Sequence, residues 1–285
     1  MTGAGLLGVA LGAHGSGRQR YAEAMALYQA GRIGPEQLEA YRIAAATDTV
    51  PPATVFSERG LPLPDSPNHT LSDAIRHLID EADRYLQSLP GPGVAETRAG
   101  IAAARSGPVT LAPHMHPVLG THLAPALRSL AATHPTLAQA IATAAPHLNW
   151  NTYNGYPLEE IGDAFPRNHV AATILGQDAP IAAHDFDLGL FLIAPHILYR
   201  DHHHAAPELY APLTGPHGWR FGPDTTLEIR PAHQPVWNPP HRPHLTKVGA
   251  VPFLCLYAWT GDVTELAHVI PAGDWPALEA LRLDP

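Results

Sequence analysis

Residues 199–215 read YRDHHHAAPELYAPLTG, and this stretch predicts a metal site on a β-strand hairpin. Successive side chains of an extended strand point to opposite faces, so His202 and His204 point to the same face and can reach one ion together. Glu208 and Tyr210 follow a turn and lie an even number of residues after His204. They are therefore expected to point to the same face as the two histidines. Glu208 therefore adds a hard anionic oxygen to the two imidazoles.

A second polar stretch lies further along the chain, where residues 238–244 read NPPHRPH. His244 would come from a different strand and complete a set of three imidazole nitrogens and one carboxylate. This set suits a divalent transition metal, namely Zn, Fe, Mn, Ni, Co or Cu, without selecting among them. The sequence predicts one such ion held by His202, His204, Glu208 and His244. The alternative is a polar hairpin whose histidines face water.

The second half of the chain has the pattern of a β-rich fold. From about Asn149 onward the apolar runs are short and are broken by Gly, Pro, Asn and Asp. Closely spaced short strands with turn residues between them indicate a sandwich or barrel. The predicted strands are 188–193, 208–211, 219–221, 227–230, 234–237, 244–248 and 253–259, with a partly helical tail around 275–283.

The first half of the chain has helical periodicity instead. In its clearest helix, 71–89, apolar residues recur along one stripe until the sequence PGPG ends the pattern. The other predicted helices are 18–30, 35–46, 96–104, 121–132 and 136–145, and the Pro-rich segment 50–67 is expected to be irregular. Since no flexible spacer separates the halves, we expect an α-helical region at 1–148 packed as one body on a barrel at 149–285.

The net charge and the cysteine content argue against several kinds of partner and cellular compartment. The net charge of −9, without any Lys/Arg cluster, argues against nucleic acid or an anionic membrane as a partner. No stretch is long and apolar enough to span a bilayer. Cys255 is the lone cysteine, so the fold needs no oxidising compartment. Residues 1–13 lack the basic start of a signal peptide, and we therefore expect a cytoplasmic protein.

The metal-ligand spacing resembles that of the cupin superfamily. His202-x-His204-x3-Glu208-x6-Gly215 matches the first cupin motif. Residues 239–244 resemble the second motif through Pro239, His241 and His244. That second motif is partial: His241 stands where the family usually has Gly, His233 replaces the leading Gly, and Val248 stands where Asn often lies.

A narrower resemblance covers roughly residues 150–262. The sequence there is similar to the cupin dimethylsulfoniopropionate (DMSP) lyases, and the Glu208-x-Tyr210 pair separates those enzymes from cupins at large. The matching residues are Gly189-Leu190-Phe191-Leu192, Pro195, Tyr199, His202, His204, Glu208, Tyr210, Leu213, Gly215, Pro240, Pro243-His244, Pro252, Leu254, Leu256-Tyr257, Trp259 and Gly261-Asp262. The resemblance implies an α+β fold in which a helical N-terminal region precedes a C-terminal cupin barrel of the jelly-roll type.

The same resemblance implies a β-elimination that converts DMSP to dimethyl sulfide and acrylate. A metal bound to the substrate carboxylate would stabilise the enolate-like transition state, and a base would remove the α proton. The resemblance implies Tyr210 as that base or as an added metal ligand. Tyr199 would be a second phenol that orients the substrate or serves as the alternative base. Aromatic faces for the sulfonium are available from Trp219, Trp237, Tyr257 and Trp259.

Other functions stay open on the sequence alone. The same elimination could act on another β-substituted acid, or the cupin could be a dioxygenase or isomerase on another small carboxylate. A non-catalytic small-molecule-binding cupin is a further alternative. Tyr210, two residues after the Glu ligand, favours elimination over oxygen chemistry, and a binding module would not need both phenols. The expected partner is thus a small carboxylate, and a homodimer is also compatible because cupins commonly dimerise.

Overall fold

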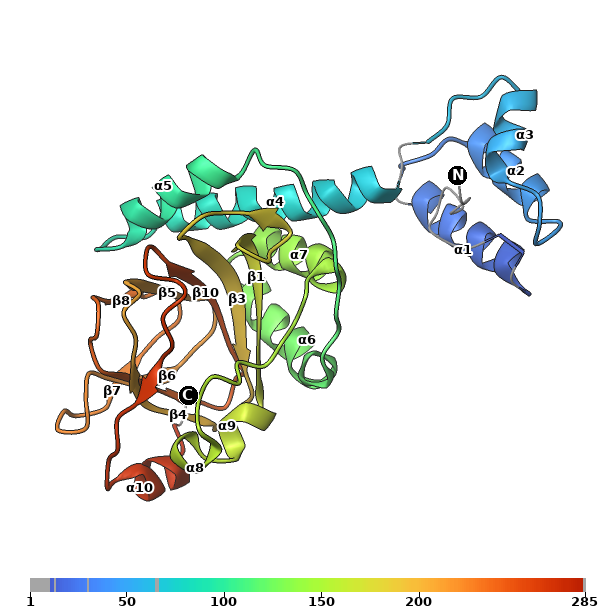
Figure 1. The fold of residues 1–285 in the computed structure, drawn as a ribbon. Helices are drawn as coiled ribbons and strands as arrows, with labels where there is room; N and C mark the ends of the chain where they lie inside the picture. The colour runs from blue at the N-terminus through green and yellow to red at the C-terminus, as the bar shows by residue number, and fades with distance from the viewer. Residues whose placement is uncertain (1–10, 13, 30, 65–66, 284–285) are drawn as a thin grey trace. The chain divides into compact units, whose positions relative to one another are not determined.

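The computed structural model describes residues 11–12, 14–29, 31–64 and 67–283 (Figure 1). The chain divides into two compact units, Met1–Asp73 and Ala74–Pro285. Residues 1–10, on which the expectation of no signal peptide chiefly depends, lie outside the described residues. Among the helices that are described, none combines the length and the apolar character that a membrane span requires.

The first unit is a small helical body with its own core. Its helices are α1 (Ser16–Gln29), α2 (Pro35–Ala44) and α3 (Pro52–Glu58). Tyr41 of α2 and Phe56 of α3 pack edge to face with ring centroids 5.1 Å apart. The expectation that 50–67 is irregular is wrong over α3. Pro52 starts this helix instead of breaking it, because the missing N–H of a first-turn residue would be unpaired anyway.

The remaining helices belong mostly to the second unit. They are α4 (Pro67–Gln87), α5 (Val94–Ala104), α6 (Pro117–Ala131), α7 (Pro135–Ala144), the 3-10 turn η1 (Ala145–His147), α8 (Leu158–Ile161), α9 (Ala164–Arg167) and α10 (Trp275–Ala280). Every helix predicted in the first half is present, with ends that differ by a few residues. The chain changes from helices to strands near residue 149 as expected, whereas the compact units divide at Asp73/Ala74. The packing of all of 1–148 on the barrel as one body therefore stays a prediction.

The strands of the second unit form two sheets. They are β1 (His169–Gly176), β2 (Ile181–Ala182), β3 (Asp187–Ile193), β4 (Leu198–His203), β5 (Glu208–Pro212), β6 (His217–Arg220), β7 (Glu228–Arg230), β8 (Val236–Asn238), β9 (His244–Val248), β10 (Phe253–Trp259) and β11 (His268–Val269). A six-stranded sheet has the order β2-β1-β3-β10-β5-β8, and a five-stranded sheet has the order β11-β4-β9-β6-β7. All pairings are antiparallel except β1 with β2. Strands β1, β2, β4 and β11 are absent from the predicted ranges, although the directions predicted for His202 and His204 assume an extended chain over part of β4.

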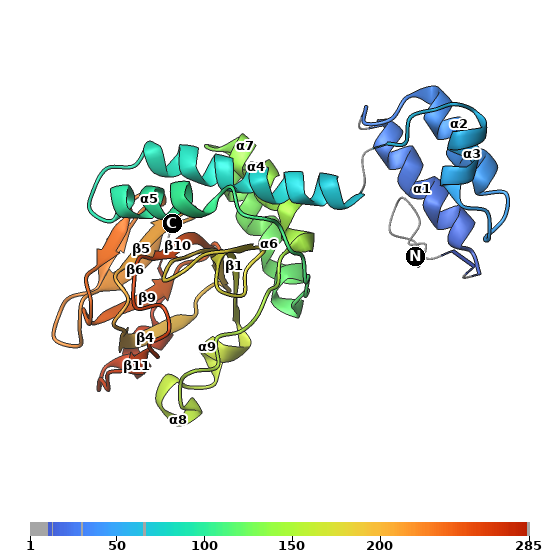
Figure 2. The same ribbon diagram turned by 45° about the horizontal axis from the view of Figure 1, so that its top comes forward.

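The six-stranded sheet is covered on both faces. Leu188, Leu190 and Leu192 of β3 point outward into a core shared with helices α4 to α7, which lie along that face in both views (Figures 1 and 2). Phe191 points inward, into a second core that also contains Trp219 of the five-stranded sheet. Because β3 is buried on both sides, its sequence is a nearly continuous apolar run. The inward face is the one that can present side chains to a ligand.

A buried ion pair ties the five-stranded sheet to α10. Asp201 of β4, fully buried, accepts hydrogen bonds from Arg220 at 2.9 Å and 2.5 Å. Arg220 also donates to Asp274 at 2.6 Å, and the Trp275 indole donates to Asp201 at 2.8 Å. Since Asp201 directly precedes His202, this network holds the strand that carries the histidine pair.

We expect Asp201→Ala to lower the free energy of unfolding by about 3 kcal/mol, because it leaves part of a buried guanidinium uncompensated. Chemical denaturation followed by circular dichroism measures the change. Asp163→Ala is the matched control, since the Asp163–Arg167 pair is exposed at both ends. Equal effects of the two substitutions would contradict a structural role for the buried pair.

Candidate metal centre and active-site cavity

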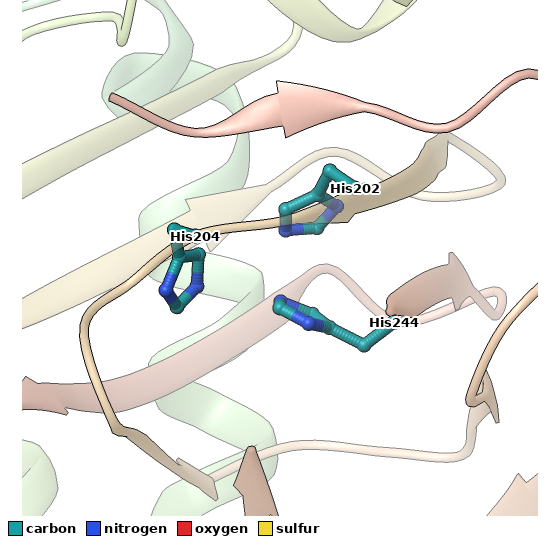
Figure 3. A group of neighbouring side chains, drawn as sticks. All are labelled: His202, His204 and His244. Carbon is teal, nitrogen blue, oxygen red and sulfur yellow. The ribbon is translucent and has the colours of Figure 1, made fainter. Parts of the chain in front are cut away.

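Three histidine side chains point toward one another (Figure 3). His202 of β4 and His244 of β9 are direct partners in the antiparallel register, so their rings leave the same face with centroids 4.0 Å apart. His204 follows β4 and turns its ring toward the same point. Potential ligand nitrogens of the three lie within 4.8 Å of one another, and all three side chains are buried.

Backbone carbonyls set the orientation of all three rings. The Nδ1–oxygen distances are 2.8 Å from His202 to Arg200, 2.8 Å from His204 to Ala206 and 2.9 Å from His244 to Arg242. A carbonyl oxygen can only accept, so each Nδ1 carries a proton and donates it. Each Nε2 is then the nitrogen available to a ligand, which is the arrangement found in most metal-binding histidines.

The carboxylate of Glu208 joins the histidines from the first position of β5. Its Oε2 lies 3.1 Å from Nε2 of His204 and 3.3 Å from Nε2 of His244. Trp259 donates its indole N–H to Oε1 at 2.7 Å, and Asn238 donates to Oε2 at 3.2 Å. Trp259 and Asn238 are the register partners of Glu208 on its two sides, so three neighbouring strands fix this carboxylate.

The electrostatics of the group follow from burial and close contact. Burial alone would raise the pKa of Glu208, but His204 and His244 hold that pKa well below its usual value. Burial lowers the pKa of His204, yet the adjacent Glu208 raises it above the ordinary value overall. Burial, together with the two other histidines, lowers the pKa of His202 well below its usual value. His202 is therefore a neutral imidazole with a free lone pair near neutral pH.

These residues fit a divalent transition metal. The Nε2 atom of His244 is buried and makes no hydrogen bond, although Oε2 of Glu208 lies 3.3 Å away, and such an arrangement is costly unless a ligand binds the nitrogen. Three imidazole nitrogens with one carboxylate are common donors for such ions, and no single metal is selected by them. The structure thus brings together the three histidines predicted as ligands, including His244 from the partial second motif, and places Glu208 against two of them.

A cavity of about 470 Å³ opens beside this group. His204 and Glu208 line it together with the two predicted phenols, Tyr199 and Tyr210. The size suits a small-molecule ligand. The cavity therefore places two of the four candidate metal ligands and both phenols around one space.

The ring of Tyr199 is held on both faces. It stacks on Phe165 at a centroid distance of 3.9 Å and on His202 at 3.9 Å. Its hydroxyl lies 2.6 Å from the hydroxyl of Tyr156. Burial, with Tyr210 and Glu208 nearby, raises the pKa of Tyr199 well above its usual value. Tyr199 is therefore a rigid, protonated phenol in the metal-free protein.

Tyr210 comes from β5, two residues after Glu208. It packs edge to face on Trp219 with ring centroids 5.1 Å apart. Burial and the negative charge of Glu208 raise the pKa of Tyr210 well above its usual value. A cation in the adjacent site would oppose both effects and favour the phenolate.

The four aromatic residues predicted as possible contacts for the sulfonium lie in different parts of the structure. Tyr257 and Trp259 line the cavity, whereas Trp219 is buried beside Tyr210 and Trp237 packs against the core on the helical side. Sequence reasoning missed Tyr156, which comes from the loop before α8 and carries no motif. It also missed the hydrogen bonds from Trp259 and Asn238 to Glu208, because both depend on strand register.

Comparison with known protein families finds a match to one family model. The family model of the DMSP lyases matches residues 91–255. The chain belongs to the DMSP lyase family. No curated protein sequence matches it. The predicted resemblance to this family is therefore confirmed.

Solved structures of DMSP lyases share the fold. A structure described among the DMSP lyases RdDddP and RnDddQII matches with 20% identity and a TM-score of 0.54, covering 70% of this chain and 98% of its own. DMSP lyase DddQ from Ruegeria pomeroyi matches with 21% identity and a TM-score of 0.50, covering 69% of this chain and 96% of its own. A cupin-like protein from Thermotoga maritima matches with 11% identity and a TM-score of 0.33, over 37% of this chain and 77% of its own. The predicted α+β fold, in which helices precede a C-terminal β-rich region of two sheets, is confirmed.

We expect His244→Ala to abolish tight binding of a divalent transition metal, because it removes a donor from the centre of the group. The loss should exceed the about 10- to 100-fold that changes to residues behind the ligands typically cost. Metal titration by calorimetry, with Zn²⁺, measures it. His203→Ala is the matched control, because His203 lies near His268 instead of in the cluster. Equal Zn²⁺ affinity in the His244→Ala variant and the wild type would remove His244 from the ligand set.

Proposed function

We propose that this protein is a metal-dependent lyase that cleaves DMSP into dimethyl sulfide and acrylate. One observation carries the proposal beyond family membership. The phenols of Tyr199 and Tyr210 line the same small cavity as His204 and Glu208. A base beside a carboxylate-binding centre is what removal of an α proton requires.

The reaction is a β-elimination. The C–H bond at the α carbon breaks and its proton passes to a base of the protein. The electron pair forms the carbon–carbon double bond of acrylate, and the C–S bond breaks with its pair leaving on dimethyl sulfide. The difficult part is the weak acidity of a carbon next to a carboxylate.

The metal would be held by His202, His204, His244 and Glu208. When bound, such an ion supplies a Lewis acid that withdraws charge from the substrate carboxylate. The chain's contribution is to hold the donors in place through carbonyls, Trp259 and Asn238. Its buried walls also limit water around the developing charge.

Tyr210 is the residue that takes the α proton in this proposal. In the metal-free protein its phenol stays protonated, because burial and Glu208 raise its pKa. The pKa of the Tyr210 phenol would fall with a cation held at the neighbouring donors, and Tyr210 would then accept the α proton as a phenolate. Tyr199, fixed between Phe165 and His202 and bonded to Tyr156, orients the substrate.

The direct test is headspace measurement of dimethyl sulfide above purified, metal-loaded protein supplied with DMSP. We expect gas to accumulate in proportion to enzyme, and acrylate to form in equal amount. Protein treated with a chelator is the control and should release none. No gas above background, with the metal confirmed bound, would rule out this activity.

We expect Tyr210→Phe to keep the bound metal and to lose turnover by about 100-fold or more, as removal of a general base typically does. Dimethyl sulfide release gives the rate, and elemental analysis gives the metal content. Tyr199→Phe should weaken turnover less, since it removes an orienting hydroxyl. Full activity of the Tyr210→Phe variant would exclude Tyr210 as the base.

A further inference from the structure

The cavity wall is strongly acidic. Among its described lining residues are three carboxylates, those of Asp178, Asp187 and Glu208, and no Lys or Arg. Glu208 is compensated by the histidines and by two neutral donors. The other two carboxylates lie away from the metal donors, so a cation at the metal site does not account for them.

Asp187 is the unusual member of this set. It is half-buried at the start of β3, and its carboxylate has no hydrogen bond or ion pair with any residue that the structure describes. Burial, with the charge of Asp178 nearby, raises the pKa of Asp187 to about 6. At neutral pH the Asp187 carboxylate is therefore ionised, although its half-buried position and the charge of Asp178 disfavour the anion. Such a charge is costly unless a positive group comes to it.

The backbone leaves room for this carboxylate. Oδ1 of Asp187 lies where a Cβ atom at Gly176 would be, so any other residue at that position of β1 would displace it. The side chain of Asp187 is therefore directed along the sheet beside β1, on the face that lines the cavity. The glycine keeps the anion accessible from the cavity.

Strand register places Asp187 relative to the metal donors. Asp187 pairs with Trp259, and Trp259 pairs with Glu208, so the three stand in one row across β3, β10 and β5. Neighbouring strands are about 4.8 Å apart, which puts the backbone of Asp187 about 10 Å from that of Glu208. A short zwitterion in the cavity that both residues line would have its carboxylate at the metal donors and its cation toward Asp187.

Aromatic rings occupy the space between the two ends. Trp259 stands in the middle of the row with its indole N–H bonded to Glu208. Tyr257, two residues earlier on the same face, has its hydroxyl bonded to Thr173 at 2.8 Å. Both rings are therefore fixed, and aromatic faces attract organic cations.

We propose that Asp187 is the specificity residue that selects a positively charged substituent at the far end of the substrate from the metal site. This inference rests on the proposed function for the anionic end of the substrate. In DMSP the selected group is the dimethylsulfonium. The charge on sulfur disappears as the C–S bond breaks, so the contact stabilises the bound substrate more than the transition state. Removal of the Asp187 charge should therefore raise KM without lowering kcat.

The test compares two ligands of one shape that need no turnover. The cationic probe is 3-(trimethylammonio)propionate, and the neutral probe is 4,4-dimethylpentanoate, which has carbon in place of nitrogen. Calorimetry on Zn²⁺-loaded wild type should show about tenfold tighter binding of the cationic probe, as a single charge contact in a partly exposed cavity allows. Asp187→Asn should bring the two affinities close together. Asp187→Ser should do the same.

Asp185→Asn is the matched control. It removes the same charge two residues away, at an exposed position outside the cavity lining, and Asn tolerates the positive φ of 50° found there. We expect this variant to keep the preference for the cationic probe. Loss of the preference in both variants would indicate a general field of the acidic surface and would overturn a specific role for Asp187.

Thermal stability separates a ligand-selecting residue from a structural one. Because burial and the nearby charge of Asp178 disfavour the Asp187 anion in the folded state and raise its pKa, Asp187→Asn should raise the melting temperature of the ligand-free protein at pH 7.5. A structural residue would lower it. An unchanged affinity ratio in Asp187→Asn, or equal binding of both probes by the wild type, would overturn the inference. Absence of dimethyl sulfide release with the preference intact would instead count against the proposed function alone.

Discussion

The buried carboxylate of Glu208 is the constraint on which the site depends. A buried anion without partners costs several kcal/mol, so its surroundings must supply positive or donating groups. His204 and His244 approach one of its oxygens, and Trp259 and Asn238 donate to the carboxylate. These partners come from β8, β9, β10 and the turn after β4. Satisfying one charge therefore fixes the relative positions of four segments.

The side of the site opposite this carboxylate is built from stacked rings. His169, Phe165, Tyr199 and His202 stack in sequence, with neighbouring centroids 3.8, 3.9 and 3.9 Å apart. The column joins the short helix α9 to a metal-ligand candidate. His169 stays neutral in it, because burial lowers its pKa to about 4. The stacked rings and the Glu208 carboxylate are both held in place. The cavity is therefore the part of the site that can accommodate different ligands.

Much of the fold follows from local sequence patterns. The stripe of apolar residues in α4 and the continuous apolar run of β10 are short-range signals, and both elements are found where they were predicted. The segment with α3 was misjudged, because a proline can start a helix as well as interrupt one. Strand β1 was missed, since its centre holds two adjacent alanines, a residue that is depleted in strands. The division at Asp73/Ala74 leaves no compositional trace, because no Gly- or Ser-rich linker marks it.

The sequence by itself determined the part of the site that lies within one hairpin. The spacing of His202, His204, Glu208 and Tyr210 sets their directions through strand parity and one turn, which are local properties. Only the tertiary structure decided what comes from elsewhere in the chain. The pairing of His244 with His202, the contact of Tyr156 with Tyr199 and the row from Asp187 to Glu208 all depend on which strands become neighbours and in which register. That choice is made by burial of whole sheet faces, which no short stretch of residues specifies.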